Sequence, residues 1–95
     1  AELAAFITPE NPFSKQLSPE DNAKRHESFK GELNKGRITF IEGYGVDDTE
    51  HWPREKSYLI SIKTKAQADS LAISYGQNAY LLCPKGKPVE LVICT

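Results

Sequence analysis

The sequence predicts a single α/β domain of the α+β type: a two-layer sandwich in the order β-α-β-β-α-β-β, ferredoxin-like or close to it. Both helices are expected on one face of a mostly antiparallel sheet. Two segments repeat apolar residues at helical spacing behind N-terminal cap signals, and five short apolar or alternating runs are typical of strands. Because 95 residues suffice for one hydrophobic core but not for two, we expect residues 1–95 to form one domain.

The first strand and the first helix are bounded by turn and cap signals. The strand is predicted over Leu3–Thr8, because Pro9 and the Asn-Pro pair that follows stop it. The helix begins after Ser18, a good N-cap, with Pro19 at its first position, and it ends at Gly36. The polar residues between them are predicted to form a loop.

Two alternating strands and a second helix follow. The strands are predicted over residues 37–41 and 58–62, separated by the long polar segment 42–57. Thr64 is followed three residues later by a glutamine, which predicts a capping box at the start of the second helix. Gly76 is expected to end this helix.

The C-terminal segment is predicted to be a β-hairpin, with strands over residues 79–83 and 89–95 around a turn that contains proline and glycine. Pairing Cys83 with Val89 places every odd-numbered residue of both strands on one apolar face, which we expect to be core. In this register Cys94 lies roughly 17 Å along the strand from Cys83, which excludes a disulfide between them. Both cysteines are therefore expected to be free, apolar side chains.

Composition and charge argue against several classes of partner. Twelve basic and thirteen acidic residues leave a formal net charge of -1, so nothing favours a nucleic acid or an anionic membrane. No apolar run reaches the roughly 20 residues that span a bilayer, and the N-terminus lacks signal-peptide features. We therefore expect a cytoplasmic protein that binds neither nucleic acid nor membrane, and we expect no cofactor.

Two consecutive amides, Gln77 and Asn78, follow the glycine that ends the second helix and precede an apolar strand. Amides at such a junction often only close the turn between helix and strand. At the mouth of a core strand they are nevertheless well placed to hydrogen-bond a ligand.

Asn22 lies on the apolar stripe of the first helix, between Phe29 and Leu33 in helical angle. Left unpaired when buried it would cost about 1–3 kcal/mol, so we expect it to hydrogen-bond residues 11–14 or a strand end. In the structural interpretation Asn22 only pins that loop. In the functional interpretation Asn22 and Arg25 belong to a ligand pocket at the helix N-terminus, where backbone N–H groups favour an anion and Arg25 adds a bidentate donor.

The segment 42–57 is long for a connection between paired strands, and such segments are usually functional or disordered. It contains four residues that could ligate a hard metal: Asp47, Asp48, Glu50 and His51. Their spacing is not that of a calcium loop, and such residues most often form a solvated acidic loop. Glu55 and Ser57 approach the next strand and could face the same pocket. Ser14, His26 and Glu55 could form a hydrolytic triad, but no nucleophile-elbow context supports it.

Five short motifs follow one another along the chain: Asn11-Pro12-x-Ser14, Leu17-Ser18-x-x-x-Asn22-x-x-Arg25, Gly43-x-Gly45-x-Asp47, Trp52-x-x-Glu55-x-Ser57 and Tyr75-Gly76-Gln77-Asn78-Ala79. In their combined order and spacing they resemble a bacterial family catalogued as domain of unknown function 3293. The resemblance spans most of the chain. It implies a small protein of unassigned activity, with polar residues at these motif positions, and it implies no reaction.

The leading hypothesis is a module that binds a small polar or anionic ligand. Seven residues are expected to form its pocket: Asn11, Ser14, Asn22, Arg25, Glu55, Gln77 and Asn78. The alternative is a protein-interaction module, acting on another protein or as a homo-oligomer, that uses the 42–57 segment and the even-numbered face of the terminal hairpin. That face carries Tyr80, Leu82 and Val92. No arrangement matches a catalytic signature, so the sequence leaves open whether the protein is an enzyme.

Overall fold

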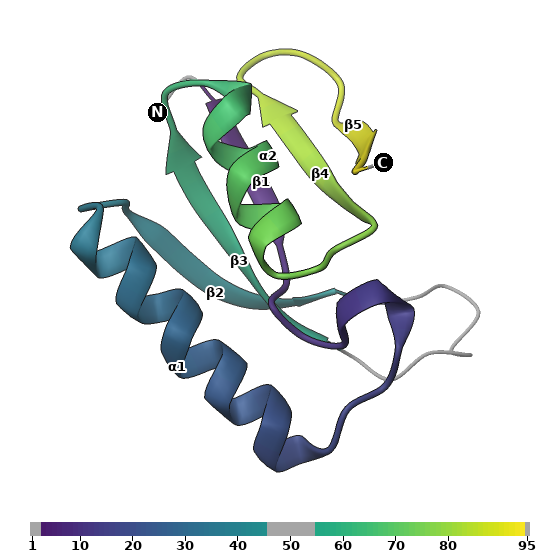
Figure 1. The fold of residues 1–95 in the computed structure, drawn as a ribbon. Helices are drawn as coiled ribbons and strands as arrows, with labels where there is room; N and C mark the ends of the chain where they lie inside the picture. Colours follow the sequence, from purple (N-terminus) through teal and green to yellow (C-terminus); the bar gives the residue numbers. More distant parts are fainter. Residues whose placement is uncertain (1–2, 46–54, 95) are drawn as a thin grey trace.

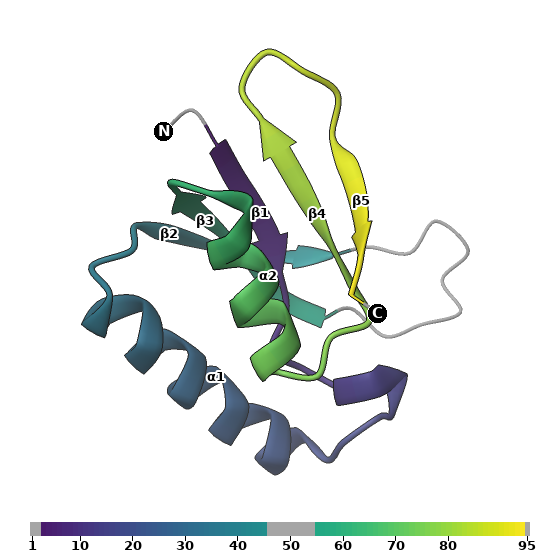
Figure 2. The same cartoon turned by 45° about the horizontal axis from the view of Figure 1, so that its top comes forward.

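The computed structural model describes residues 3–45 and 55–94. It confirms the predicted fold class, because two helices pack on one face of a five-stranded antiparallel sheet. Figure 1 and Figure 2 show both helices on the same side of the sheet. None of the helices in the described ranges is long and apolar enough to cross a membrane.

Strand β1 (Leu3–Ile7) is followed by a single 3-10 turn, η1 (Pro12–Ser14), and by the long helix α1 (Pro19–Lys35). The helix begins as predicted. The Ser18 hydroxyl oxygen accepts a hydrogen bond from the backbone N–H of Asp21 at 3.1 Å, and proline occupies the first turn. The η1 turn lies within the segment that was predicted to be an irregular loop.

Strands β2 (Phe40–Gly45) and β3 (Glu55–Ile62) form a longer hairpin than the sequence indicated. The predicted start of β2 at residue 37 is wrong, because residues 37 and 38 close the end of α1. Arg37 is left-handed, with a φ of 56°, and the Ile38 N–H donates to a carbonyl of the last turn at 2.8 Å. Both strands also extend into segment 42–57, so only its middle part connects them.

An ion-pair cluster accompanies this extension of the hairpin. The Glu42 carboxylate on β2 lies 2.5 Å from the ammonium of Lys56 on β3 and 3.3 Å from that of Lys30 on α1. Hydrogen bonds from the two lysines hold the pKa of Glu42 below its usual value. Glu42 and Lys56, which lie in the segment that the sequence predicted to be a loop, therefore form a contact between two strands.

The second half of the chain contains α2 (Lys65–Ser74), β4 (Ala79–Pro84) and β5 (Glu90–Ile93). The capping box at the start of α2 is present: the side-chain oxygen of Gln67 accepts the backbone N–H of Thr64 at 3.2 Å. The helix ends before a glycine in the left-handed conformation, as predicted.

The five strands lie in the order β2-β3-β1-β4-β5, each antiparallel to its neighbours. Strand β3 is inserted between β1 and β2, and β1 is inserted between β3 and β4. This is the split βαβ arrangement of ferredoxin-like folds, and β5 adds one strand at the edge.

The hydrophobic core lies between the sheet and the two helices. The rings of Phe29 on α1, Tyr58 on β3 and Tyr75 after α2 pack together, with centroids 5.0 Å apart in both pairs that involve Phe29. Aliphatic side chains of β1 and β3, such as Ile7 and Ile60, complete the core beneath them.

The predicted register of the terminal hairpin is confirmed, since Leu81 pairs with Leu91 and Ala79 with Ile93. The prediction that the odd-numbered face is core is wrong. The even-numbered residues Tyr80 and Leu82 are 3% and 5% exposed, because this face of β4 points toward α2 and the core side of β1. The odd-numbered side chains instead point away from both helices. The even face is thus closed to the partner that the alternative hypothesis assigned to it.

Both cysteines are free, as predicted. Each thiol is partly buried, and burial raises the pKa of the Cys83 thiol and of the Cys94 thiol above the usual range. The two residues therefore behave as small apolar side chains rather than as reactive thiolates.

Candidate functional site

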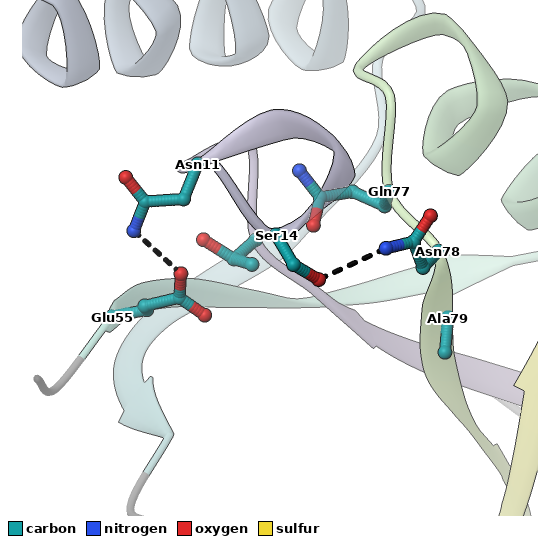
Figure 3. A pocket seen from close by; sticks show the side chains of 7 residues that line it. Asn11, Ser14, Glu55, Gln77, Asn78 and Ala79 are labelled. Carbon is teal, nitrogen blue, oxygen red and sulfur yellow. Dashed lines mark hydrogen bonds between the residues drawn. The ribbon is translucent and has the colours of Figure 1, made fainter. Parts of the chain in front are cut away.

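A cavity of about 360 Å³ lies where three distant segments meet: the loop after β1, the start of β3 and the turn between α2 and β4. It is lined by Thr8, Asn11, Ser14, Glu55, Gln77, Asn78 and Ala79. Figure 3 shows side chains of the three segments gathered around it. Five of the residues predicted to form a pocket are thus brought together: Asn11, Ser14, Glu55, Gln77 and Asn78.

The loop after β1 has an unusual backbone. Asn11, Phe13 and Ser14 have φ angles of 48°, 55° and 59°, in a region that costs non-glycine residues about 1–3 kcal/mol each. The backbone N–H of Phe13 donates to the carbonyl of Gly76 at 2.6 Å, which ties this loop to the α2–β4 turn. Strained residues of this kind cluster at binding and catalytic sites.

Gly76 is required at this junction for two reasons. Its own φ is 67°, and a Cβ at this position would lie 2.9 Å from the Cβ of Pro12 and 3.1 Å from the Phe13 ring. The sequence indicated only the first role, as the residue that ends a helix. The structure adds the second, because a glycine lets the loop after β1 approach the turn.

Asn11 organises one wall of the cavity. Its side-chain oxygen accepts the backbone N–H of Leu17 and an amide N–H of Asn22, each at 2.9 Å. Its side-chain nitrogen donates to the Glu55 carboxylate at 2.7 Å, and its backbone N–H donates to the Asn22 side-chain oxygen at 3.0 Å. Asn11 therefore fixes the position of Glu55, and Asn22 fixes Asn11.

This network contains the contact that was expected of Asn22, which bonds the loop before its helix. Asn22 itself does not line the cavity but stands behind Asn11. It lines a neighbouring, more open depression together with Glu10 and His26. Its contacts correspond to the structural interpretation of this residue.

Gln77 and Asn78 form the opposite wall. The Gln77 side-chain nitrogen donates to the backbone carbonyls of Glu10 at 2.8 Å and Tyr75 at 3.2 Å, so its oxygen must point the other way. Within residues 3–45 and 55–94 no donor contacts that oxygen, and Figure 3 shows it on the side of the amide that faces Ser14, another lining residue of the cavity. The Asn78 side-chain nitrogen donates to the Ser14 hydroxyl at 2.9 Å.

The electrostatic character of the cavity is acidic. Among its described lining residues Glu55 is the one ionisable group, and the amide of Gln77 lines the opposite wall. A carboxylate and a carbonyl-type oxygen accept hydrogen bonds and attract positive charge. The cavity therefore suits a group that donates N–H hydrogen bonds.

Arg25 is not brought to the cavity. Its guanidinium donates to the backbone carbonyls of Pro9 and Tyr75, and it stacks over the Tyr75 ring at 5.4 Å. It thereby joins the loop after β1 to the end of α2 from the side of α1. The guanidinium group that was predicted to bind an anion therefore hydrogen-bonds the protein's own backbone.

A partly buried chain of polar side chains that sequence reasoning missed lies next to the cavity. His26 contacts the Tyr58 hydroxyl through Nδ1 and the Glu10 carboxylate through Nε2, both at 2.7 Å. Burial raises the pKa of Tyr58 to about 12. With this hydroxyl as donor to Nδ1, Nε2 carries the proton and donates to Glu10. The triad of His26, Ser14 and Glu55 is not formed, since His26 has these other partners.

The four acidic and histidine residues considered as metal ligands lie at positions 47–51, outside the described residues. Within the described ranges no group of three histidine, cysteine or acidic residues could hold a metal ion.

Comparison with known proteins identifies a family and nothing more specific. The model of the family described as "Protein of unknown function (DUF3293)" matches residues 7–80. The match contains every residue that lines the cavity. Nothing matches the chain among curated proteins or among solved structures. Because more than half of the chain is matched, and in agreement with the five motifs, the protein belongs to the DUF3293 family.

Proposed function

We propose that the protein binds a small polar ligand that carries N–H donors, such as an ammonium, guanidinium or amide group, between Glu55 and Gln77. The observation that supports this proposal is that one cavity is lined by a carboxylate and by an amide whose oxygen has no donor among the described residues, while the described lining residues include no cation. At about 30 Å³ for each water-sized group, the cavity accommodates a ligand of about ten non-hydrogen atoms.

The fixed positions of the acceptors support this proposal. Glu55 is held by Asn11, which is itself held by Asn22, and the Gln77 amide is held by two backbone carbonyls. A ligand that meets groups already in place loses less free energy to the ordering of side chains. The strained backbone of the loop after β1 also supports the proposal, because such strain lowers stability and is found mainly at functional sites.

The anionic ligands that the sequence also allowed are not part of this proposal. They depended on Arg25, whose guanidinium donates to two backbone carbonyls outside the cavity. An anion would also meet the Glu55 carboxylate without a compensating charge among the described lining residues.

The test compares two probes of equal size and opposite charge, agmatine and glutarate, which have the same number of non-hydrogen atoms. We expect agmatine to raise the thermal midpoint in a concentration-dependent manner and glutarate to leave it unchanged, because only a ligand that prefers the folded state stabilises it. Isothermal titration calorimetry then gives the stoichiometry, expected to be one ligand per chain.

Two variants locate the binding. Glu55→Gln keeps an oxygen that can accept the Asn11 hydrogen bond but removes the negative charge, so the agmatine shift should disappear while the fold persists. Glu27→Gln removes an exposed carboxylate on α1 that lines none of the described cavities and serves as the matched control. A shift that survives Glu55→Gln, or one produced by glutarate instead of agmatine, would contradict the proposal.

A further inference from the structure

A continuous row of large apolar side chains crosses the face of the sheet that carries no helix. Register pairs Ile41 with Leu59, Leu59 with Phe6, Phe6 with Leu81, and Leu81 with Leu91. The row therefore contains one residue from each of the five strands, and at about 4.8 Å per strand it is roughly 19 Å long. We call this row, together with Ile93, the apolar row; Ile93 lies two residues beyond Leu91 on the same side of β5.

This composition is unusual for a sheet face that meets water. An antiparallel sheet with helices on one side normally carries polar side chains on the other. Here the outward positions within the described strands contain one charged residue, Glu55, which lies at the end of β3 beside the cavity. The other outward positions of these described strands carry no charge.

The exposed area matches what a stable dimer needs. Ile41, Leu91 and Ile93 are 66%, 65% and 58% exposed, and Leu59 and Leu81 are each 37% exposed. Together they present on the order of 500 Å² of apolar surface, near the upper end for the largest patch on a monomer. A standard interface buries about 800 Å² per partner. In homodimer interfaces about 65% of the buried area is apolar, which corresponds to roughly 500 Å² per partner.

The pattern of large and small side chains on this face also allows a second copy of the chain to pack against it. Beside the apolar row lies a row of small residues, Ser61, Ala4 and Cys83, which are paired across β3, β1 and β4. A ridge of large side chains next to a line of small ones is self-complementary, because a two-fold axis can set the ridge of each copy over the small residues of the other. Two sheets packed in this way stand about 10 Å apart.

We propose that the protein forms a two-fold symmetric homodimer through the helix-free face of its sheet, with the apolar row at the centre of the interface. A second copy is the occupant that these observations favour, because the outward positions of the described strands carry no charge besides Glu55 to complement a charged partner. The patch supplies the apolar share of a standard dimer interface. The observations that favour this dimer do not involve ligand binding in the cavity.

The experiment measures the mass of the protein by sedimentation equilibrium from about 1 µM to about 1 mM, a range that brackets dissociation constants typical of transient and stable dimers. The parent is expected to sediment as a dimer at the upper end. Ile41→Lys places a charge in the apolar row, and we expect it to raise the dissociation constant at least about 100-fold.

The matched control is Ile73→Lys. Ile73 is also an isoleucine and is 64% exposed, against 66% for Ile41, but it lies on α2, on the opposite side of the sheet. It should leave the dimer intact. Far-UV circular dichroism and thermal unfolding establish that both variants are folded, and Leu91→Lys on β5 provides a second variant in the row.

The outcomes separate clearly. A dimer that is lost in Ile41→Lys or Leu91→Lys and kept in Ile73→Lys supports the proposal. A parent that remains monomeric at about 1 mM overturns it and leaves the face to a different occupant. A dimer that responds equally to the row variants and to Ile73→Lys also overturns it, since the contact then uses another surface. If the row variants fail to fold, NMR chemical shifts of the parent are measured as a function of protein concentration. Concentration-dependent shifts at the apolar row support the proposal, and shifts confined to another surface overturn it.

Discussion

Replacing Gly76 by alanine is expected to destabilise the protein by about 3 kcal/mol. The backbone contributes roughly 1–2 kcal/mol, because a φ of 67° lies in the left-handed region, where an added Cβ crowds the following carbonyl. The second contribution is steric: the new methyl group would lie 2.9 Å from Pro12 Cβ. Forcing such a group into a packed contact typically costs about 1–3 kcal/mol. The two ranges add to about 2–5 kcal/mol, and the estimate of about 3 kcal/mol lies within this sum.

Gly86→Ala separates the two contributions. Gly86 has a comparable φ of 73°, but a Cβ there meets nothing within 4 Å. This variant should therefore lose only the backbone part, about 1–2 kcal/mol. The difference between the two variants measures the close approach of the loop after β1 to the α2–β4 turn.

Thermal unfolding monitored by circular dichroism gives the readout. For a domain of this size 1 kcal/mol corresponds to about 4–8 °C, so the midpoint should fall by roughly 15 °C for Gly76→Ala and by roughly half of that for Gly86→Ala. Equal decreases in the two variants would refute the reasoning. In that case the contact between Pro12 and Gly76 would contribute nothing measurable, and the wall of the cavity would not depend on it.

Two further predictions concern hydrogen-bonded polar side chains. Asn22→Ala removes both hydrogen bonds to Asn11 and should cost about 2 kcal/mol more than Asn34→Ala, an exposed asparagine on the same helix; equal urea midpoints for the two variants would contradict this. Because the folded protein raises the pKa of Tyr58 from 10.0 to about 12, the Tyr58 contribution to stability is complete below about pH 10 and is lost as the pH rises toward 12. Tyr58→Phe should therefore show a smaller decrease in the free energy of unfolding between about pH 9 and pH 12 than the parent, and an identical decrease would show that Tyr58 is not the group responsible.

Local sequence signals predicted the elements well where neighbouring residues decide the structure. Ser18 and Pro19 start α1, and Thr64 starts α2, because capping bonds involve residues only a few positions apart. The pairing of the terminal hairpin was predicted correctly for the same reason, since its turn is short and sets which residues face each other. The ends of β2 were not predicted correctly, because contacts with α1 and β3 determine where this strand begins and ends.

The face of the hairpin that is buried could not be decided locally. Both faces of β4 are apolar, with Leu81 on one side and Leu82 on the other. Which of them is core depends on the side of the sheet that receives the helices, and that follows from the crossover connections between distant strands. The same ambiguity hid the apolar row, which is assembled from five strands.

The sequence by itself determined the class of fold, the two helices with their caps, the two free cysteines and the family. It also selected most of the cavity, since polar side chains such as Gln77 and Asn78 stand at element ends, in the turn between a helix and a strand. Only the tertiary structure decided that Arg25 binds backbone carbonyls and that Glu10, His26 and Tyr58 form a chain. Those contacts join residues 16 to 50 positions apart, and the partner of a long polar side chain is set by the packing of whole elements rather than by its neighbours in sequence.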